Sequence, residues 1–128
     1  MDIEEAKKYL LTFPESCEDY PFGPDVAVIK VKNKMFALLC VRKGVPQVNL
    51  KCDPDEAFML RDLFPAVLPG YHMNKLHWNT VIFDKTIPKE EIMGMMEKSY
   101  RLVVKGLKKA DRNPLMLRYA DFFIDAVV

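Results

Sequence analysis

Glycine and cysteine are scarce in this sequence of 128 residues, which holds five glycines and three cysteines. Together with 50% hydrophobic and 29% charged residues, the low glycine content excludes collagen-like and disordered chains and is typical of a globular protein. Cys17, Cys40 and Cys52 are odd in number and widely spaced, without a C-x-x-C pair. This pattern argues against a disulfide framework and against a zinc site, so we expect reduced, structural thiols.

The sequence also lacks a long hydrophobic run. Its longest apolar stretch, Met35 to Val41, is much shorter than the roughly 20 residues that cross a bilayer. Met1 is followed by the acids Asp2, Glu4 and Glu5, which carry the wrong sign for a secretory signal or a transit peptide. We therefore expect a cytoplasmic protein with no membrane partner.

Recognisable catalytic signatures are missing as well. The sequence contains no G-x-S-x-G, P-loop, G-x-G-x-x-G or H-E-x-x-H motif and no paired-carboxylate signature. Such motifs supply nucleophiles, phosphate-binding loops and metal ligands, so their absence leaves no candidate catalytic residue. We expect a protein that is not an enzyme and that has no cofactor and no metal site.

Charge is unevenly distributed along the chain, although the formal net charge is only +1. Residues 1–25 hold seven acids and two lysines, which sum to −5. Residues 26–52 hold no acid and six bases, which sum to +6. These bases are Lys30, Lys32, Lys34, Arg42, Lys43 and Lys51. Such a block suits contact with a nucleic acid, and it also suits a solvated surface that only keeps the protein soluble.

Hydrophobic periodicity predicts a helix and then three strands in the first half of the chain. The helix is expected from Asp2 to Thr12 and is ended by Pro14. A loop rich in proline and glycine is expected from Pro14 to Pro24. The strands are predicted over Val26–Lys32, Met35–Val41 and Gln47–Cys52, joined by turns at Asn33-Lys34 and Arg42–Pro46 into an antiparallel meander.

The second half of the chain is predicted to alternate between helices and strands. Asp53 is the expected N-cap of a helix that ends near Phe64, because Pro54 and Glu56 follow it at positions typical of a helix start. The next segments are a turn region, a short extended piece, a strand and a long helix, over Pro65–Gly70, Tyr71–Asn74, His77–Phe83 and from Pro88 onward.

The long helix is expected to have an apolar side and a basic side. Its apolar stripe comprises Ile92, Met95, Met96, Ser99, Val103 and Leu107. Its basic stripe, within an arc of roughly 100°, comprises Lys98, Arg101, Lys105, Lys108, Lys109 and Arg112. The basic stripe is either a second charged surface or a solvated face.

The predicted order is α-β-β-β-α-β-β-α, which indicates an α+β fold with a mainly antiparallel sheet and helices packed on one face. We place one domain over residues 1–112. Residues 113–128 are an apolar C-terminal extension, predicted to be helical and docked on the domain or on a partner, where it would support a homo-oligomer. Its apolar residues at helical spacings are Leu115, Tyr119, Phe122, Phe123 and Val127.

The segment from Pro69 to Val81 gathers both histidines and the only tryptophan of the chain. It contains no carboxylate, serine or cysteine, so it has the character of a contact surface and not of a catalytic site. Its candidate contact residues are His72, Asn74, Lys75, His77, Trp78 and Asn79.

Four blocks of the sequence carry a family resemblance. They are Asp19-Tyr20-Pro21-Phe22-Gly23, Lys34-Met35-Phe36-Ala37, Asn49-Leu50-Lys51-Cys52-Asp53-Pro54 and the run from Gly70 to Val81. In this order and spacing they resemble the MmcQ/YjbR family of small bacterial proteins, from Met1 to about Arg112. That family is similar in fold to CyaY-like α+β proteins. The chain departs from it at Asn33, where glycine is common in the first hairpin turn, and in the extension after Arg112.

The resemblance implies a DNA-binding role through two protruding hairpin wings. Carried over to this chain, it assigns phosphate contacts with little sequence preference to Lys30, Lys32, Lys34, Arg42, Lys43 and Lys51. It leaves donation to phosphates or base edges to His72, Asn74, Lys75, His77 and Asn79. Trp78 would stack on an unpaired base if single strands bind.

Several other interpretations of the same residues stay open. The protein is alternatively a small-molecule or protein-binding module, with a pocket where Tyr71, His72, His77 and Trp78 lie beside Tyr20-Pro21-Phe22. Trp78 alone also suits a packing role in the core or at its rim. The histidines can fix a bend through backbone hydrogen bonds while Asn74 caps the turn. The fold analogy also suggests iron binding by the acids between Asp2 and Asp25. This interpretation has little support, because the acids are divided between a helix and a loop.

Overall fold

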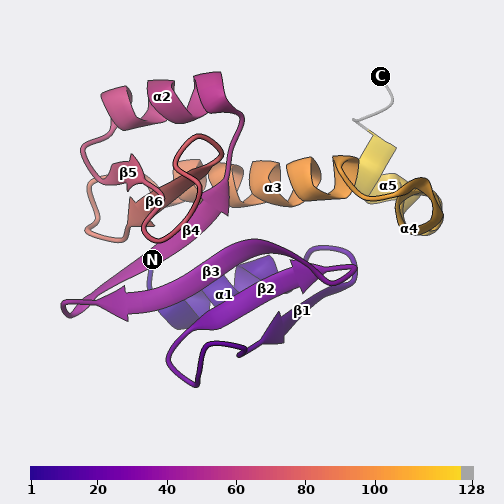
Figure 1. The fold of residues 1–128 in the computed structure, drawn as a ribbon, viewed down its shortest axis with the longest axis horizontal. Coiled ribbons are helices and arrows are strands. Elements are labelled where there is room, and N and C mark those ends of the chain that lie inside the picture. The colour runs from indigo at the N-terminus through magenta and orange to yellow at the C-terminus, as the bar shows by residue number, and fades with distance from the viewer. Residues whose placement is uncertain (125–128) are drawn as a thin grey trace.

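Residues 1–124 are described by a computed structural model, in which helices and strands follow the order shown in Figure 1. The helices are α1 (Ile3–Leu10), α2 (Pro54–Leu63), α3 (Lys89–Lys105), α4 (Lys109–Arg118) and α5 (Ala120–Phe123). The strands are β1 (Ser16–Asp19), β2 (Ala27–Val31), β3 (Lys34–Arg42), β4 (Val45–Lys51), β5 (Val67–Pro69) and β6 (Trp78–Ile82). Val127, which we expected on the apolar side of the C-terminal extension, lies outside the described residues.

Two aspartates begin the first two helices as side-chain caps. A carboxylate oxygen of Asp2 accepts a hydrogen bond from the backbone N–H of Glu5 at 2.8 Å. At α2, Oδ1 of Asp53 accepts from the N–H groups of Asp55 and Glu56 at 3.1 and 3.5 Å. These bonds satisfy N–H groups that have no partner inside the helix. The N-cap predicted at Asp53 is therefore confirmed.

The two hairpins of the meander turn more tightly than predicted. The β2–β3 turn consists of Lys32 and Asn33, with φ of 47° and 66°, and the β3–β4 turn consists of Lys43 and Gly44, with φ of 53° and 78°. Positive φ at both central residues is the geometry of a two-residue type I′ turn, whose twist matches that of the flanking strands. The turn predicted at Asn33-Lys34 was therefore wrong by one residue. The turn predicted over Arg42–Pro46 was too long.

The six strands form one antiparallel sheet in the order β1-β2-β3-β4-β6-β5. The α+β fold and the β2-β3-β4 meander are confirmed, but the predicted order missed strand β1 and placed β5 wrongly. We expected a loop around Ser16–Asp19 and a turn around Val67–Pro69. Both segments are short, and they lie at the two edges of the sheet. Short edge strands are held mainly by backbone hydrogen bonds to one neighbour. Their side chains therefore show little of the alternation between apolar and polar residues by which strands are predicted.

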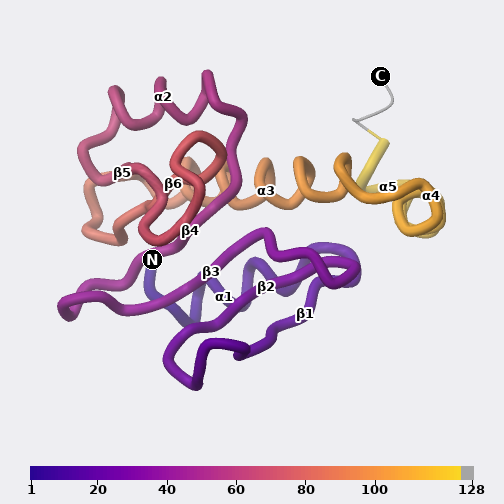
Figure 2. The backbone as a smooth tube through the Cα atoms, in the orientation of Figure 1, coloured from indigo at the N-terminus to yellow at the C-terminus, as the bar shows by residue number. Residues whose placement is uncertain are grey.

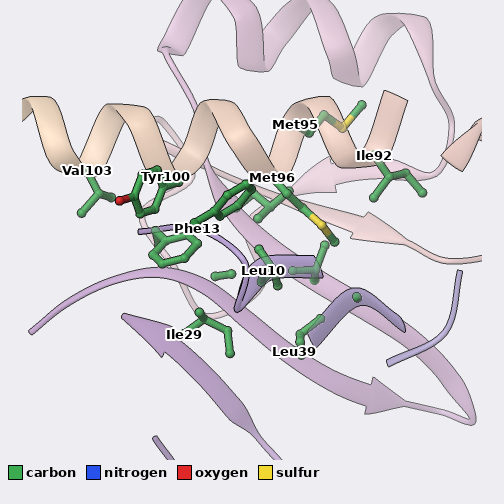
Figure 3. Close-up of a cluster of buried hydrophobic side chains, with 14 of the residues drawn as sticks. Leu10, Phe13, Ile29, Leu39, Ile92, Met95, Met96, Tyr100 and Val103 are labelled. Atoms are coloured by element: carbon green, nitrogen blue, oxygen red, sulfur yellow. The ribbon is translucent and has the colours of Figure 1, made fainter. Parts of the chain in front are cut away.

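Helices α1 and α3 cover one face of the sheet, and the main hydrophobic core lies between them and the strands. Figure 3 shows Leu10 from α1 and Met96 from α3 directed toward Ile29 and Leu39 of the sheet. Each of these side chains is at most 1% exposed. The apolar stripe predicted for the long helix is buried along its whole length, from Ile92 to Leu107, so that prediction is confirmed.

Tyr100 of α3 is the centre of an aromatic cluster in this core (Figure 3). Its ring centroid lies 5.0 Å from that of Phe13, 5.1 Å from that of Phe36 and 5.5 Å from that of Phe122. The side chain is fully buried, and its hydroxyl donates a hydrogen bond of 2.7 Å to the carbonyl of Pro14. Burial raises the pKa of this phenol. Tyr100 thus joins α3 to the residues that follow α1, to β3 and to the C-terminal segment.

Ser99, the neighbour of Tyr100, fastens α3 to two strands by hydrogen bonds. Its buried hydroxyl donates to the carbonyl of Phe36 at 2.6 Å and accepts from the N–H of Lys51 at 2.9 Å. One serine therefore satisfies two backbone groups that would otherwise be buried without a partner.

The C-terminal helices differ from the predicted continuous helix. Helix α3 ends at Lys105 with Gly106 as its C-cap, so the predicted basic stripe is divided, and Lys108 is the N-cap of α4. Helix α4 crosses Arg112, where we expected the domain to end. Leu115 and Phe123, which belong to the predicted extension, are buried in the protein's own core. Among the described residues, no helix combines the length and the apolar character needed to cross a membrane.

We expect Tyr100→Phe to lower the free energy of unfolding by about 1–3 kcal/mol, because the buried carbonyl of Pro14 loses its donor while the aromatic packing is kept. The measurement is urea unfolding followed by circular dichroism. Tyr20→Phe is the matched control, since Tyr20 is 39% exposed and water can replace its hydroxyl. It should change stability by less than about 0.5 kcal/mol. Equal losses in the two variants would contradict the role given to Tyr100.

Candidate nucleic-acid interface

The two hairpin turns that carry the predicted basic wings lie at opposite ends of β3. We call residues 32–34 the β2–β3 tip and residues 42–44 the β3–β4 tip. Strand β3 has nine residues, and at about 3.3 Å per residue it spans about 30 Å. Figure 2 shows the chain reversing direction at both tips, one at each end of β3. The basic block of the sequence is therefore divided between two separate places.

Each tip presents a lysine in the left-handed backbone region. Lys32 has φ of 47° and Lys43 has φ of 53°. A residue with a Cβ rarely adopts this conformation and loses roughly 1 kcal/mol or more by doing so. Asn and Gly adopt positive φ at a lower energetic cost. Asn33 is the second residue of the β2–β3 turn, and Gly44 is the second residue of the β3–β4 turn. The lysines therefore occupy strained positions that local backbone preference does not favour.

Acidic partners hold the lysines of the first hairpin. Lys30 pairs with Asp19 across the β1–β2 ladder, with 2.9 Å between ammonium and carboxylate. Lys32 pairs with Glu15 at 2.9 Å, and Arg118 of α4 reaches the same carboxylate at 3.1 Å. Because β1 lies along the edge of β2, the acidic N-terminal segment comes to rest beside the basic block. The charge separation seen along the sequence is largely cancelled here in space.

These ion pairs change the titration of the two acids. The hydrogen bond from Lys32 is the main reason why the pKa of Glu15 lies below its usual value, and Arg118 adds to it. The hydrogen bond from Lys30 lowers the pKa of Asp19 in the same way. Asp19 is exposed and Glu15 is half-buried at the surface, so these pairs contribute modestly to stability, and they neutralise the charge of Lys30 and Lys32. In the first hairpin, Lys34 is the exposed base outside these pairs.

The β3–β4 tip lies next to an aromatic surface. The guanidinium of Arg42 sits 3.6 Å from the centroid of the Tyr71 ring, and the rings of Tyr71 and His72 are 4.0 Å apart. Tyr71 is 38% exposed, and Lys43 and His72 are exposed as well. Stacking on the tyrosine fixes the arginine plane at the surface. The tip and residues 70–77, which we call the Tyr71 loop, thus form one cationic and aromatic surface.

A polar network fixes the Tyr71 loop on the face of the sheet that α1 and α3 leave open. Asn49 and Thr80 alternate with the core residues Val48 and Val81, so their side chains point to that face. The hydroxyl of Thr80 donates to Oδ1 of Asn49 at 2.5 Å and accepts from the N–H of Tyr71 at 2.9 Å. The amide of Asn49 donates to the carbonyl of Tyr71 at 3.3 Å.

Local contacts explain the sharp bend of the Tyr71 loop. Oδ1 of Asn74 accepts from the N–H of Leu76 at 2.9 Å, so the prediction that Asn74 caps this turn is confirmed. The ammonium of Lys75 donates to the carbonyl of Gly70 at 2.8 Å. A Cβ on Gly70 would lie 2.8 Å from the Cβ of Trp78 and 2.9 Å from its carbonyl oxygen, so glycine is required there. Trp78 itself is half-buried.

Of the other predicted contact residues, Lys51 and Asn79 lie outside the Tyr71 loop, and His77 is its last residue. Lys51 faces Trp78 on the β4–β6 ladder, at the end of β4 far from its tip. His77 is half-buried, and its carbonyl accepts from the N–H of Cys52 at 2.8 Å. Asn79 is only 3% exposed and is therefore inaccessible to a phosphate. Its Oδ1 accepts from Nε of Arg61 at 2.7 Å, and its amide donates to the carbonyl of Ala57. The prediction that Asn79 contacts DNA is wrong for this reason.

The pocket expected beside Tyr71, His72, His77 and Trp78 stays a prediction, and a well-formed pocket lies elsewhere. A pocket of about 200 Å³ lies on the helix-covered face, between α2 and α3, and its lining includes none of those four residues. Asn79 and Val81 are the parts of the predicted segment that reach it. Within residues 1–124, no three His, Cys, Asp or Glu side chains are grouped closely enough to hold a metal ion.

Sequence reasoning missed the residues that control these surfaces. Glu15 and Asp19 neutralise two of the predicted phosphate contacts, and their signal was visible only as the acidic segment 1–25. Arg61 was missed altogether. Its side chain holds Asn79 and the carbonyls of Lys75 and Trp78, so it secures the C-terminal half of the Tyr71 loop from α2.

Known proteins with similar sequences cover nearly the whole chain. Residues 11–102 match the model of the YjbR family. The uncharacterized protein YbdF of Escherichia coli O157:H7 is 40% identical over 111 residues, which is 85% of this chain and 89% of that protein. The uncharacterized protein YjbR of Escherichia coli K12 is 31% identical over 116 residues, covering 91% of this chain and 98% of that protein.

Solved structures agree with this assignment. A crystal structure of a Deinococcus radiodurans protein superposes with a TM-score of 0.82 at 36% identity, covering 89% of this chain and 87% of that chain. A Pseudomonas syringae protein gives a TM-score of 0.71 at 29% identity, covering 80% of this chain and 98% of that chain. The match in sequence extends over the meander, the Tyr71 loop and most of α3, and the structures share the same fold. The chain therefore belongs to the YjbR family.

Proposed function

We propose that this protein is a non-catalytic DNA-binding protein that contacts phosphates with its two hairpin tips. The observation that carries the proposal is the exposed lysine at each tip, Lys34 and Lys43. A lysine at the end of a hairpin extends into solvent, where it can neutralise a phosphate and release its counterions.

The spacing of the tips supports contact with a duplex. The two tips are about 30 Å apart along β3, and successive turns of B-DNA present equivalent backbone positions about 34 Å apart on one face. One protein can thus contact two phosphate positions that are about one helical turn apart. Such contacts position a protein on DNA and carry no sequence information by themselves.

The surface around the β3–β4 tip supports a second mode of contact. Arg42 is stacked on Tyr71 with its guanidinium at the surface, and His72 and Lys43 are exposed beside it. An arginine held in this way can donate two parallel hydrogen bonds to a phosphate. We therefore assign the stronger contribution to the β3–β4 tip and the weaker one to the β2–β3 tip, whose Lys32 is paired with Glu15.

Reversal of one charge at each tip, by Lys34→Glu with Lys43→Glu, should weaken binding to duplex DNA by at least tenfold at low salt. The slope of log affinity against log salt should fall by about 2, because each lost phosphate contact removes about 0.9. Fluorescence anisotropy of a labelled duplex at several salt concentrations measures both quantities. Lys108→Glu with Lys109→Glu makes the same charge change at exposed positions of the α3–α4 junction. If the control pair lost as much affinity, general charge and not the tips would govern binding.

Duplex length gives a separate test of the two-tip geometry. Contacts about 30 Å apart need about ten base pairs, so affinity should drop sharply between duplexes of about 14 and about 6 base pairs. The short duplex should bind the native protein about as weakly as the long duplex binds a protein with Lys34→Glu alone. A smooth decrease in proportion to length would show that a single tip makes the contacts.

Neutral substitution of the acids that hold the first hairpin should strengthen binding. Glu15→Gln with Asp19→Asn releases Lys32 and Lys30 from their carboxylates and removes two negative charges near the β2–β3 tip. We expect an affinity increase of about fivefold to tenfold at low salt, which disappears at high salt. The same anisotropy titration measures it. An unchanged affinity would mean that this tip does not approach the DNA.

A further inference from the structure

A pocket on the helix-covered face of the sheet lies away from both hairpin tips. It has a volume of about 200 Å³ and opens between α2 and α3, above the ends of β4 and β6. Its apolar lining comprises Leu50, Leu60, Val81, Met95 and Leu102. A concave, mainly apolar site with a few polar groups is the usual form of a small-molecule site.

Gly94 gives independent support for a pocket that is kept open. It lies inside α3, six residues after Pro88, and it lines the pocket. A Cβ at this position would meet nothing within 4 Å, so packing against the rest of the protein does not require glycine. Glycine inside a helix is less stable than alanine. Gly94 is exposed at the rim of the pocket, so a bulky side chain there would narrow the opening.

The charges around the mouth cancel. Lys98 of α3 and Glu56 of α2 form an ion pair of 2.6 Å that joins the two helices beside the pocket. The other charged residues of the lining are Lys51 and Glu91, which have opposite signs. With two bases and two acids, the lining offers no net charge to a bound molecule. An ionised ligand would lose hydration and meet charges of both signs, without a net electrostatic gain.

Cys52 contributes a neutral thiol to the same lining. Burial, followed by the nearby carboxylates of Glu56 and Asp53, raises the pKa of Cys52 to about 11. The thiol therefore stays protonated at neutral pH and acts as a small apolar surface, not as a nucleophile.

We propose that the pocket between α2 and α3 binds a small, uncharged and mainly apolar molecule, of the size of a single substituted ring. The size follows from the volume, because an apolar cavity of about 150 Å³ holds benzene. A molecule of about eight non-hydrogen atoms fits the space, and its binding energy is limited by that size. This site is separate from the proposed DNA contacts, so either proposal can fail without the other.

The test uses three probes of nearly equal size that differ in charge, namely benzyl alcohol, benzoate and benzylammonium. Titrations are followed by amide chemical shifts of the full-length protein. We expect benzyl alcohol to produce saturable shifts at Cys52, Leu60 and Gly94. The charged probes should bind at least tenfold more weakly. Absence of saturable shifts at the lining, or equally tight binding of a charged probe, would overturn the proposal.

Variants at Gly94 test whether benzyl alcohol binds in this pocket. Gly94→Phe should weaken benzyl alcohol binding at least tenfold, because the ring occupies the mouth, whereas Gly94→Ala should bind as the native protein does. Both side chains suit a helix better than glycine, so the fold should be retained and the amide spectra check it. A second readout needs no variant: at raised pH, where part of the Cys52 thiol is ionised, bound benzyl alcohol should slow its alkylation at least threefold. Alkylation of Cys17, which is exposed, should stay unchanged. Unaltered binding in Gly94→Phe together with an unprotected Cys52 would place the probe elsewhere and refute the site.

Discussion

The buried side chain of Tyr100 joins the long helix α3 to several other parts of the core. Its ring packs against Phe13, Phe36 and Phe122, and its hydroxyl binds the carbonyl of Pro14. These contacts hold α3 across the helix-covered face, while Ser99 on the same turn fixes it to β3 and β4. With this face occupied, the opposite face is left for the Tyr71 loop and the ends of β3 are left for the tips. A core of this kind tolerates little change in position, because its side chains are close-packed.

Strand β1 determines how much of the basic block is available to a partner. It contributes backbone hydrogen bonds to the edge of β2, and it brings Glu15 and Asp19 to Lys32 and Lys30. An edge strand with charged side chains also discourages pairing with other chains. The same acids therefore protect the sheet edge and weaken the positive field of the first hairpin. The asymmetry between the two tips is a direct result.

The two proposed binding surfaces use different faces of one sheet. The tips and the Tyr71 loop belong to the open face and to the ends of β3, where charge is exposed to solvent. The pocket belongs to the helix-covered face, where α2 and α3 diverge and the lining charges cancel. Asn79 lines that pocket, and Arg61 of α2 binds both Asn79 and the carbonyls of Lys75 and Trp78. One side chain of α2 thus contacts both regions.

Local patterns in the sequence were enough to predict several elements. These were the helix starts at Asp2 and Asp53, the buried stripe of α3 and the meander, because caps and periodicity act over a few residues. Family blocks in the sequence also indicated the fold. Which charges remain available depends on tertiary contacts, because Glu15 and Asp19 meet their lysines through strand pairing. Tertiary contacts also bury Asn79 and place the pocket between α2 and α3. Those outcomes depend on contacts between residues far apart in the chain, and local sequence patterns do not encode them.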